Sequence, residues 1–577
     1  MKKALSVFLM TAMAFGAFAQ DAEPVADVNI AEFSGNAAVQ WGVDLDTMKT
    51  GFKNSYEVNL KLNLLNNGTK STTGDGVWGE LVLKTEEDTF IGWENGDDSP
   101  EMNDEYINAN TGLMGDGRNF GLKVYVDTAK IHIGPAYIGI KRGDTQTGEL
   151  KMDAAIRSAD DDQSKWLENV GPAKYSEGIV LGLDTEVVKL DLDLRSYAAL
   201  SGERNGHGHE DERQSHQYSD AYAAALEAEL KGDGIGVEGL SVKGGVSFNF
   251  AENYYPGPDE NGNYAPWKIP FATLDQNGIP TGLLRTLGYS ASVAYKLGLD
   301  DTFYVRPQVG FTGQTGFFEN EDAKVSVTYT DKLAIAAGLL FGWGEIGMDQ
   351  NAGVYYLDDD HAKKVSPGVG VVAYIPLPSK TTADYNGKKT SHKQYTGLIR
   401  IMPSFYSGEI VPGLTAAAYA DIGVTKLAKD DTEGPDTVDY ITEEAKVPMA
   451  FALGAQYAIP VGEMTITPKA GIRFANAAYV DYKVPEKGVG VFKDMGVQQE
   501  LAPTAEDRTK YGLEHDGNFM NLKLGVDVGG LIDNTTLSVI WDTKNILNDT
   551  SYGDGVGDVA RFGPKLGTLN FKAKIAL

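Results

Sequence analysis

Apolar and polar residues alternate one by one in segments along the whole chain, and this period-two pattern limits the possible folds more than any other feature. Residues 56–64 and 188–194 show it near the N-terminal end, and residues 569–577 show it at the C-terminal end. Successive side chains of a strand point to opposite faces, so the pattern predicts strands with one apolar and one polar face. The predicted strands are about 9 to 12 residues long, which suits tilted membrane strands better than soluble strands of about 5 to 6 residues.

The connections between these strands are expected to alternate between short and long. Short connections are predicted at 184–186, 298–301, 330–332, 460–463 and 532–535. Long connections are predicted at about 142–176, 198–220, 251–286, 376–393, 423–448, 480–517 and 544–565. If the C-terminus lies in the periplasm, every long connection falls outside and every short one inside, which is the pattern of outer-membrane barrels.

The predicted fold class is therefore all-β: a large antiparallel transmembrane β-barrel of about 16–22 strands. A sheet in lipid must close on itself, because no water is available to satisfy a free strand edge. The apolar faces would then meet lipid and the polar faces would line a lumen. Three prolines, Pro307, Pro403 and Pro468, fall inside predicted strands and are expected at bulges or strand ends. The alternative is a secreted, soluble all-β protein.

Aromatic residues near predicted strand ends are candidates for the girdles that such barrels place at the membrane interfaces. Packing within the protein is an equally good explanation for any one of them. The candidates are Trp41, Tyr289, Tyr304, Trp343, Tyr406, Tyr479 and Trp541.

The N-terminal residues have the three-part layout of a secretory signal peptide. Lys2 and Lys3 precede an uncharged apolar stretch over 4–18, and Ala17 and Ala19 supply the small residues that a signal peptidase reads. Cleavage is expected after Ala19, and a short membrane anchor is the alternative. The chain contains no cysteine, which excludes disulfides, thiolate metal sites and cysteine nucleophiles.

The chain is strongly acidic, with a formal net charge of −30. Nucleic acid is therefore not an expected partner, because polyanions repel one another. Disorder is not expected either, since 42% of the residues are hydrophobic and 10% are aromatic. In a barrel, the acidic excess predicts an electronegative pore or vestibule that favours cations.

Several segments resemble the treponemal major outer sheath protein family, which includes the Tpr proteins. They are residues 38–45 with 51–54, residues 76–81, and the hairpin at 295–307. The resemblance implies a surface-exposed outer-membrane protein with porin activity. It also implies a protein that is often a homotrimer and that in some members is an adhesin for host matrix proteins.

The family is described as having two regions, which gives a division into a signal peptide at 1–19, an N-terminal β region at 20–230 and a C-terminal barrel region at 231–577. The N-terminal strands alternate as cleanly as the C-terminal ones, which favours one barrel wall from end to end. A periplasmic domain at 20–230 is the structural alternative.

Three histidines, His207, His209 and His216, lie close together among acidic residues and can ligate Zn²⁺ or Ni²⁺. A solvated charged loop is the simpler interpretation, so no metal site and no cofactor are predicted. Residues 232–236 are glycine-rich but lack the spacing and the following helix of a phosphate-binding loop, and are read as a turn. The chain contains none of the hydrolase, metalloprotease or nucleotide-binding motifs considered, and an enzyme is not predicted.

The sequence thus favours an outer-membrane porin for small hydrophilic solutes, with its long loops exposed at the surface. The alternative is a surface adhesin that binds host ligands through those loops. Outer-membrane lipid and small solutes are the expected partners.

Overall fold

The computed structural model describes residues 31–576 of the 577-residue chain, with gaps. The larger gaps are residues 66–76, 93–124, 143–151, 157–176, 199–219, 255–281, 350–363, 434–446, 477–518 and 548–565. The predicted signal peptide and its cleavage site after Ala19 lie outside the described residues.

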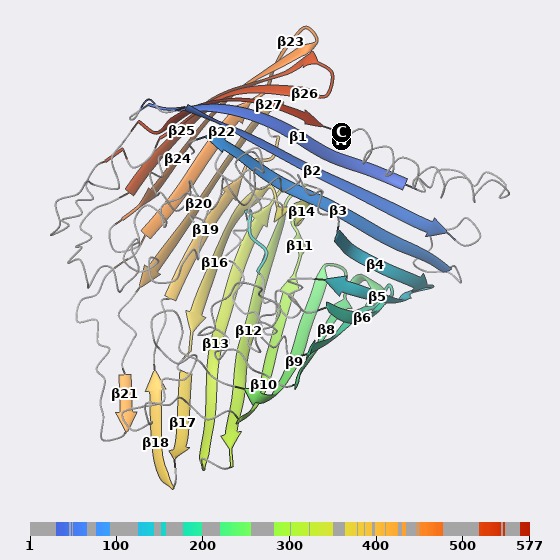
Figure 1. Ribbon diagram of the computed structural model, residues 1–577, viewed down its shortest axis with the longest axis vertical. Coiled ribbons are helices and arrows are strands. Elements are labelled where there is room, and N and C mark those ends of the chain that lie inside the picture. The colour runs from blue at the N-terminus through green and yellow to red at the C-terminus, as the bar shows by residue number, and fades with distance from the viewer. Residues whose placement is uncertain are drawn as a thin grey trace, which may run out of the picture.

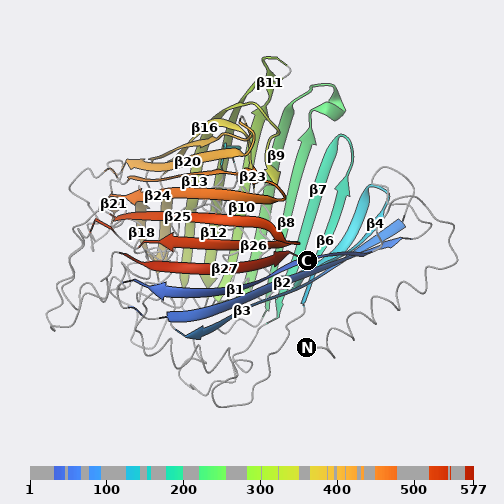
Figure 2. The same ribbon diagram turned by 90° about the horizontal axis from the view of Figure 1, so that it is seen from above.

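The described strands form an antiparallel sheet that closes on itself as a barrel of 20 strands. Closure joins the first and last described strands: β1 (Ala31–Asp44) pairs with β27 (Thr568–Ala576). Their register runs from Asn36 opposite Ala576 to Asp44 opposite Thr568. Figure 1 shows β1 in blue beside β27 in dark red, and Figure 2 shows the same pair from above. The predicted fold class and the predicted range of strand number are confirmed.

The other strands of the wall follow one another in chain order. The first half continues with β2 (Thr50–Leu65), β3 (Val77–Gly92), β4 (Tyr125–Ile133), β5 (Ala136–Arg142), β6 (Glu177–Asp184), β7 (Val188–Ala198), β8 (Asp220–Lys231), β9 (Leu240–Tyr254) and β10 (Gly282–Tyr295). The second half consists of β12 (Tyr304–Asn320), β13 (Val325–Gly342), β16 (Gly368–Pro376), β19 (Ile399–Tyr406), β20 (Leu414–Val424), β22 (Met449–Tyr457), β24 (Met464–Ala475), β25 (Phe519–Ile532) and β26 (Thr535–Asp542). A helix long and apolar enough to cross a membrane is not found in the part of the chain that the structure describes.

Smaller elements lengthen the wall at both rims. β11 (Leu297–Gly298) and β23 (Ile459–Val461) extend two hairpins at the rim where β1 begins and β27 ends. At the opposite rim, β17 (Ser379–Tyr385), β18 (Lys388–Gln394) and β21 (Asp430–Glu433) continue the sheet outward from β13. The remaining pair, β14 (Met348–Asp349) and β15 (Lys364–Val365), forms a separate two-stranded sheet.

Most short connections lie at one rim and most long connections at the other, as the sequence predicts, but two connections depart from this pattern. The rim where β1 begins and β27 ends, called here the short rim, has tight connections such as 134–135, 185–187, 232–239, 299–303 and 533–534. In the 232–239 connection, a 3₁₀ turn, η7 (Asp233–Ile235), follows Gly232, in agreement with the predicted turn. The predicted long connections leave from the opposite rim, called here the long rim. The two exceptions are 321–324, which is short but lies at the long rim, and 343–367, which is long but joins β13 to β16 at the short rim.

One predicted turn is wrong. Residues 330–332 lie inside β13, and the chain reverses earlier, at 321–324 between β12 and β13. The register between these strands shifts between Thr312 and Gln314, opposite the predicted turn. Polar residues at 330–332 therefore mark a bulge in a long strand rather than a reversal of the chain. The predicted long connection at 376–393 also differs, because β17 and β18 form a hairpin within it.

The three prolines lie where pairing with one neighbouring strand is interrupted. Pro307 falls between the β10 and β11 segments that pair with β12, and Pro468 falls between the β22 and β23 segments that pair with β24. Pro403 falls in a break of the β19–β20 pairing. Because a proline cannot donate to a ladder, these breaks allow the ladder on the other side to continue.

Candidate functional site

The polar face of the strands lines the barrel interior, and its side chains are better shielded than those of the apolar face. On β7, Asp193 is 2% exposed while the next residue, Leu194, is 39% exposed. On β9, Ser247 is 1% exposed and Phe248 is 45% exposed. In a soluble protein the apolar side chain would be the buried one, so this inverted pattern is typical of a barrel whose outer face meets lipid.

Aromatic side chains cluster on the outer face near both rims. Near the short rim, Phe341 lies 5.8 Å from Phe303 and 6.3 Å from Trp343 between ring centroids. Near the long rim, the rings of Trp41 and Phe571 are 5.4 Å apart. Such clusters are what interfacial girdles require, because amphipathic rings sit at the level of the lipid headgroups.

Two of the girdle candidates are wrong. Tyr304 and Tyr406 are each 2% exposed. Tyr304 lies on the same face of β12 as Arg306 and Gln308, which is the lumenal face, and Lys296 Nζ lies 4.6 Å from its ring centroid. Strand-end position alone does not tell which face an aromatic residue takes. Tyr479 lies outside the described residues.

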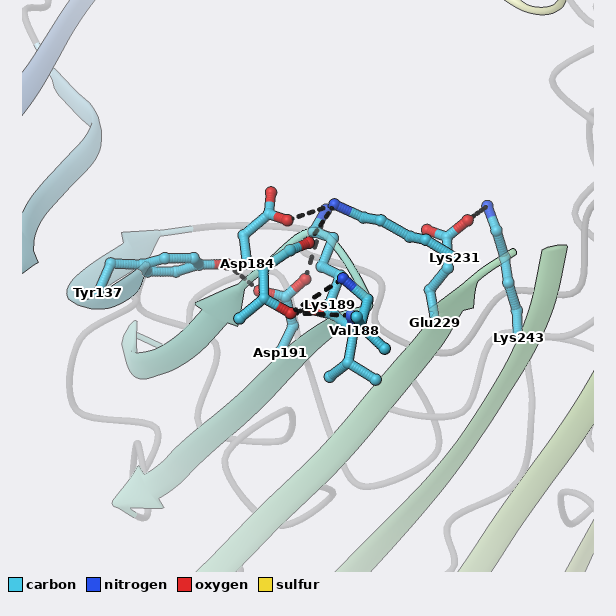
Figure 3. A network of polar contacts seen from close by, with 10 residues as sticks. Tyr137, Asp184, Val188, Lys189, Asp191, Glu229, Lys231 and Lys243 are labelled. Carbon is cyan, nitrogen blue, oxygen red and sulfur yellow. Dashed lines mark hydrogen bonds and ion pairs between the residues drawn. The ribbon is translucent and has the colours of Figure 1, made fainter. Parts of the chain in front are cut away.

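A network of charged side chains covers the lumenal face of β6 to β9 (Figure 3). Its ion pairs join acidic and basic residues within a strand, on neighbouring strands or across one intervening strand. They are Lys189–Asp191 at 3.6 Å within β7, Lys243–Glu229 at 3.7 Å between β9 and β8, and Lys231–Asp184 at 2.5 Å from β8 across β7 to β6. The side chains are partly exposed, so each pair contributes only about 0–1 kcal/mol to stability. The network matters more for the electrostatic field that it creates in the lumen.

An aromatic stack on β3 to β5 adjoins this network. The rings of Trp78 and His132 are 3.7 Å apart and nearly parallel, and His132 lies 5.3 Å from Tyr137. The hydroxyl of Tyr137 donates a hydrogen bond to Asp191 across β6. This reach is possible because β6 has Gly182 in between, where a Cβ atom would lie 2.0 Å from the tyrosine ring. The stack and the charged network therefore form one continuous lumenal surface.

A short segment of the connection between β5 and β6 folds into the barrel and is called here the inward segment, residues 152–156. Arg306 Nε of β12 donates to Asp153 Oδ2 at 2.8 Å, and the amide of Asp153 donates to Gln308 Oε1 at 2.7 Å. Further on, the amide of Ala155 donates to Ser404 Oγ of β19 at 3.0 Å. Ile156 is only 1% exposed. The inward segment is thus fastened to the inner wall by side chains of two strands.

The inward segment also meets a connection that comes from the opposite rim. Ile156 forms an antiparallel bridge with Val365 of β15, and the amide of Ser366 donates to the carbonyl of Ala155 at 3.0 Å. Ser366 Oγ in turn accepts from the amide of Gly347 at 2.7 Å. Two connections, one from each rim, therefore join inside the barrel, where they narrow the lumen.

Ion pairs also line the wall on the second half of the barrel. Arg400 Nη2 lies 2.6 Å from Asp421 Oδ2, and Lys469 Nζ lies 2.6 Å from Asp527 Oδ2. Both pairs join neighbouring strands. Outside the wall, at the short rim, backbone N–H groups of Phe303 and Thr302 donate to Asp300 and hold the pKa of this carboxyl below its ordinary value.

The predicted site residues lie elsewhere. His207, His209 and His216 fall outside the described residues. Among the residues that are described, no group of three or more His, Cys, Asp or Glu side chains is placed to hold a metal ion. Sequence reasoning missed Asp153, Arg306 and Gln308. Alternation along β12 puts Arg306 and Gln308 on its polar face, but no local pattern shows that this face binds Asp153, which lies 153 and 155 residues away in the sequence.

Comparison with known proteins finds relatives along the whole chain. The major surface protein MspTL of Treponema lecithinolyticum is 29% identical, and the major outer membrane protein MspA of Treponema maltophilum is 28% identical; both alignments cover 100% of this chain and of the relative. No family model matches the chain.

Among solved structures the likeness is distant. A loop-deletion mutant of OmpT, an outer membrane protein of Vibrio cholerae, has a TM-score of 0.33 and 10% identity, covering 74% of this chain and 98% of that one. Pseudomonas aeruginosa OccK5 has a TM-score of 0.27 and 11% identity, covering 95% of this chain and 98% of that one.

The full-length relationship to these two treponemal proteins confirms the predicted resemblance to the major outer sheath proteins and the predicted outer-membrane location. The chain is an outer-membrane β-barrel surface protein, related over its whole length to the treponemal major surface proteins.

Proposed function

We propose that this protein is a porin through which small hydrophilic solutes diffuse across the outer membrane. The observation that carries the proposal is a closed barrel whose outer face is apolar and exposed while its inner face is polar and charged. A barrel with a purely structural role would have no need of charged side chains such as Asp193 and Arg473 in its interior. The partly filled lumen, with the inward segment fastened to one side, suits a narrowed passage rather than a wide pore.

Cation preference belongs to the same proposal. The connection at 93–124 joins β3 to β4 at the long rim and contains seven acidic and two basic residues. The lumenal face itself carries both signs of charge. We therefore expect the cation preference to arise from the field at the outer mouth rather than from a binding site in the wall.

The proposed porin is tested by recording currents from the folded protein in planar lipid bilayers. We expect stepwise conductance increments and, in a salt gradient, a reversal potential of the sign that cation preference gives. A folded protein that inserts without conducting would contradict the porin proposal, and a reversal potential of the opposite sign would contradict the cation preference.

We also propose that residues 20–230 belong to the same membrane-spanning wall as residues 231–577. The support is the unbroken pairing from β1 to β9, with β8 and β9 joined from Asp220 opposite Glu252 to Lys231 opposite Ser241. We expect the fragment 20–230 and the rest of the chain to partition together into detergent. Recovery of the N-terminal fragment in the aqueous phase would favour a periplasmic domain instead.

A second candidate function is adhesion, and one observation favours it. The hairpin of β17 and β18 carries the sheet beyond β16 and β19 at the long rim, which faces outward in the proposed orientation. Shortening this hairpin to a two-residue turn is expected to reduce binding of the reconstituted protein to immobilised extracellular-matrix protein while its conductance persists. Undiminished binding would show that the hairpin is not the adhesive surface.

The homotrimer that the resemblance implies stays a prediction, which the mass of the detergent-solubilised protein tests.

A further inference from the structure

Charged side chains are unevenly distributed around the lumen. The described lumenal side chains of β7 and β8 include more acids than bases, and the charged ones are Lys189, Asp191, Asp193, Glu227, Glu229 and Lys231. Two of the acids, Asp191 and Glu227, occupy directly opposed positions on the two strands. We call this surface the acidic sector.

The lumenal face of β24 and β25 has the opposite balance. Its charged side chains are Lys469, Arg473, Lys523 and Asp527. Lys523 Nζ also lies 3.8 Å from Asp542 Oδ2 of β26, so the excess over β24 to β26 is one positive charge. Arg473 lies opposite Asn521 in the register and is 7% exposed, so its charge is held within the wall rather than in open solvent. We call this surface the basic sector.

The two sectors face each other across the lumen. In pairing order from β1, β7 and β8 are the seventh and eighth strands of the wall, whereas β24 and β25 are the seventeenth and eighteenth of 20. Strands half a circumference apart in a closed barrel lie on opposite walls. Figure 1 shows β24 and β25 at the upper left and β8 at the lower right.

The inward segment lies between the two sectors and reduces the space between them. It is fastened to β12 and β19, the eleventh and fourteenth strands of the wall, on the arc that separates β8 from β24. A solute that passes the inward segment therefore moves between a wall with excess negative charge and a wall with excess positive charge. The field in a narrow, low-dielectric passage is stronger than the same charges would produce in open water.

We propose that this transverse field makes the protein a channel that favours small zwitterions, such as free amino acids and short peptides, over uncharged solutes of equal size. The ammonium group of a zwitterion is attracted to the acidic sector and its carboxylate to the basic sector, so one orientation is favoured and its local concentration rises. An uncharged solute gains no such electrostatic attraction from the two sectors. This inference rests on the proposed porin function and names its substrate class.

The test compares entry of serine and of glyceramide, its uncharged isomer, into liposomes that contain the reconstituted protein. Swelling rates are corrected for protein-free liposomes. We expect serine to enter faster than glyceramide by about two-fold or more. Equal rates, or faster entry of glyceramide, would overturn the proposal, whereas failure of both solutes to enter would instead contradict the porin function.

A four-site variant then removes the field without changing the net charge: Asp193→Asn, Glu227→Gln, Arg473→Gln and Lys523→Gln. We expect the ratio of the two rates to fall toward that of uncharged solutes. A matched control makes the same kinds of change at the long rim: Glu321→Gln, Asp384→Asn, Lys324→Gln and Lys389→Gln. We expect the control to keep the wild-type ratio.

Folding of each variant is checked by the heat-dependent shift in gel migration that intact barrels show. If the four-site variant does not fold, the pair Asp193→Asn with Glu227→Gln is used alone, and a reduced ratio is again expected. A folded variant that keeps the full wild-type ratio would show that the two sectors do not select the solute.

Discussion

At the scale of single residues, Gly182 illustrates a position whose role depends on a neighbouring strand. Alternation predicts that it lies in a strand with its apolar neighbours facing outward, but not why the residue is glycine. In the structure the ring of Tyr137 crosses Gly182 to reach Asp191. The requirement comes from a cross-strand contact, so it cannot be read from β6 alone.

We predict that Gly182→Ala destabilises the barrel by about 1–3 kcal/mol, because the added methyl group displaces the tyrosine ring. Gly529→Ala is the matched control, since a Cβ atom there would meet nothing within 4 Å. Urea unfolding of the detergent-solubilised protein measures both. Equal stability of the two variants would show that Tyr137 does not need the space over Gly182.

At the scale of elements, the sequence predicts the membrane strands well and the contents of the lumen poorly. A strand such as β7 shows its two faces in its own residues, because period-two alternation is local. The inward segment shows nothing comparable, since its contacts with Gln308 and Ser404 join residues 155 and 249 positions apart. The polar residues 330–332 resemble a turn in the sequence because polar residues also occur where a long strand leaves the apolar belt.

The fastening of the inward segment predicts a specific effect on conductance. Arg306 and Asp153 are shielded, at 11% and 17% side-chain exposure, so Asp153→Ala leaves a charged group without its carboxylate partner. We expect the inward segment to loosen and the single-channel current to become larger and noisier. Asp527→Ala removes the same charge from the lumen without touching the inward segment, and is expected to leave the noise unchanged. The same noise in both variants would mean that lumenal charge alone is responsible.

A disulfide provides an independent test of the same element, because the chain contains no cysteine of its own. Ile156 and Val365 are antiparallel bridge partners, whose Cα spacing of about 4.5–5.5 Å permits a disulfide. We expect Ile156→Cys with Val365→Cys to form a bond on oxidation and to suppress the current noise of Asp153→Ala. Reduction should restore that noise. Failure of the two cysteines to cross-link would place the inward segment elsewhere.

At the scale of the whole molecule, net charge and lumenal charge have different consequences. The chain carries a formal charge of −30, yet its lumenal face has basic as well as acidic sectors. Overall composition predicted an electronegative pore or vestibule, but it could not predict that opposite signs face one another across the barrel. That arrangement depends on closure, which brings strands far apart in the sequence to opposite walls.

We predict that replacing the seven acidic residues of 93–124 by their amides reduces the cation preference without closing the channel. The reversal potential in a salt gradient measures the change. In about 1 M salt, where the Debye length is about 3 Å, the wild type and the variant should converge. An unchanged reversal potential at low salt would assign the preference to the wall instead.

The central claim is that both halves of the chain form one closed wall around a conducting lumen, and cysteine accessibility tests it most directly. Single cysteines are placed at neighbouring positions of two opposite strands, Asp193 and Leu194 on β7 and Lys523 and Leu524 on β25, and a membrane-impermeant thiol reagent is added during bilayer recording. We predict stepwise block of the current at 193 and 523 and none at 194 and 524. Block at 523 without block at 193 would remove the N-terminal half from the wall, and block at neither lumenal position would contradict the conducting barrel altogether.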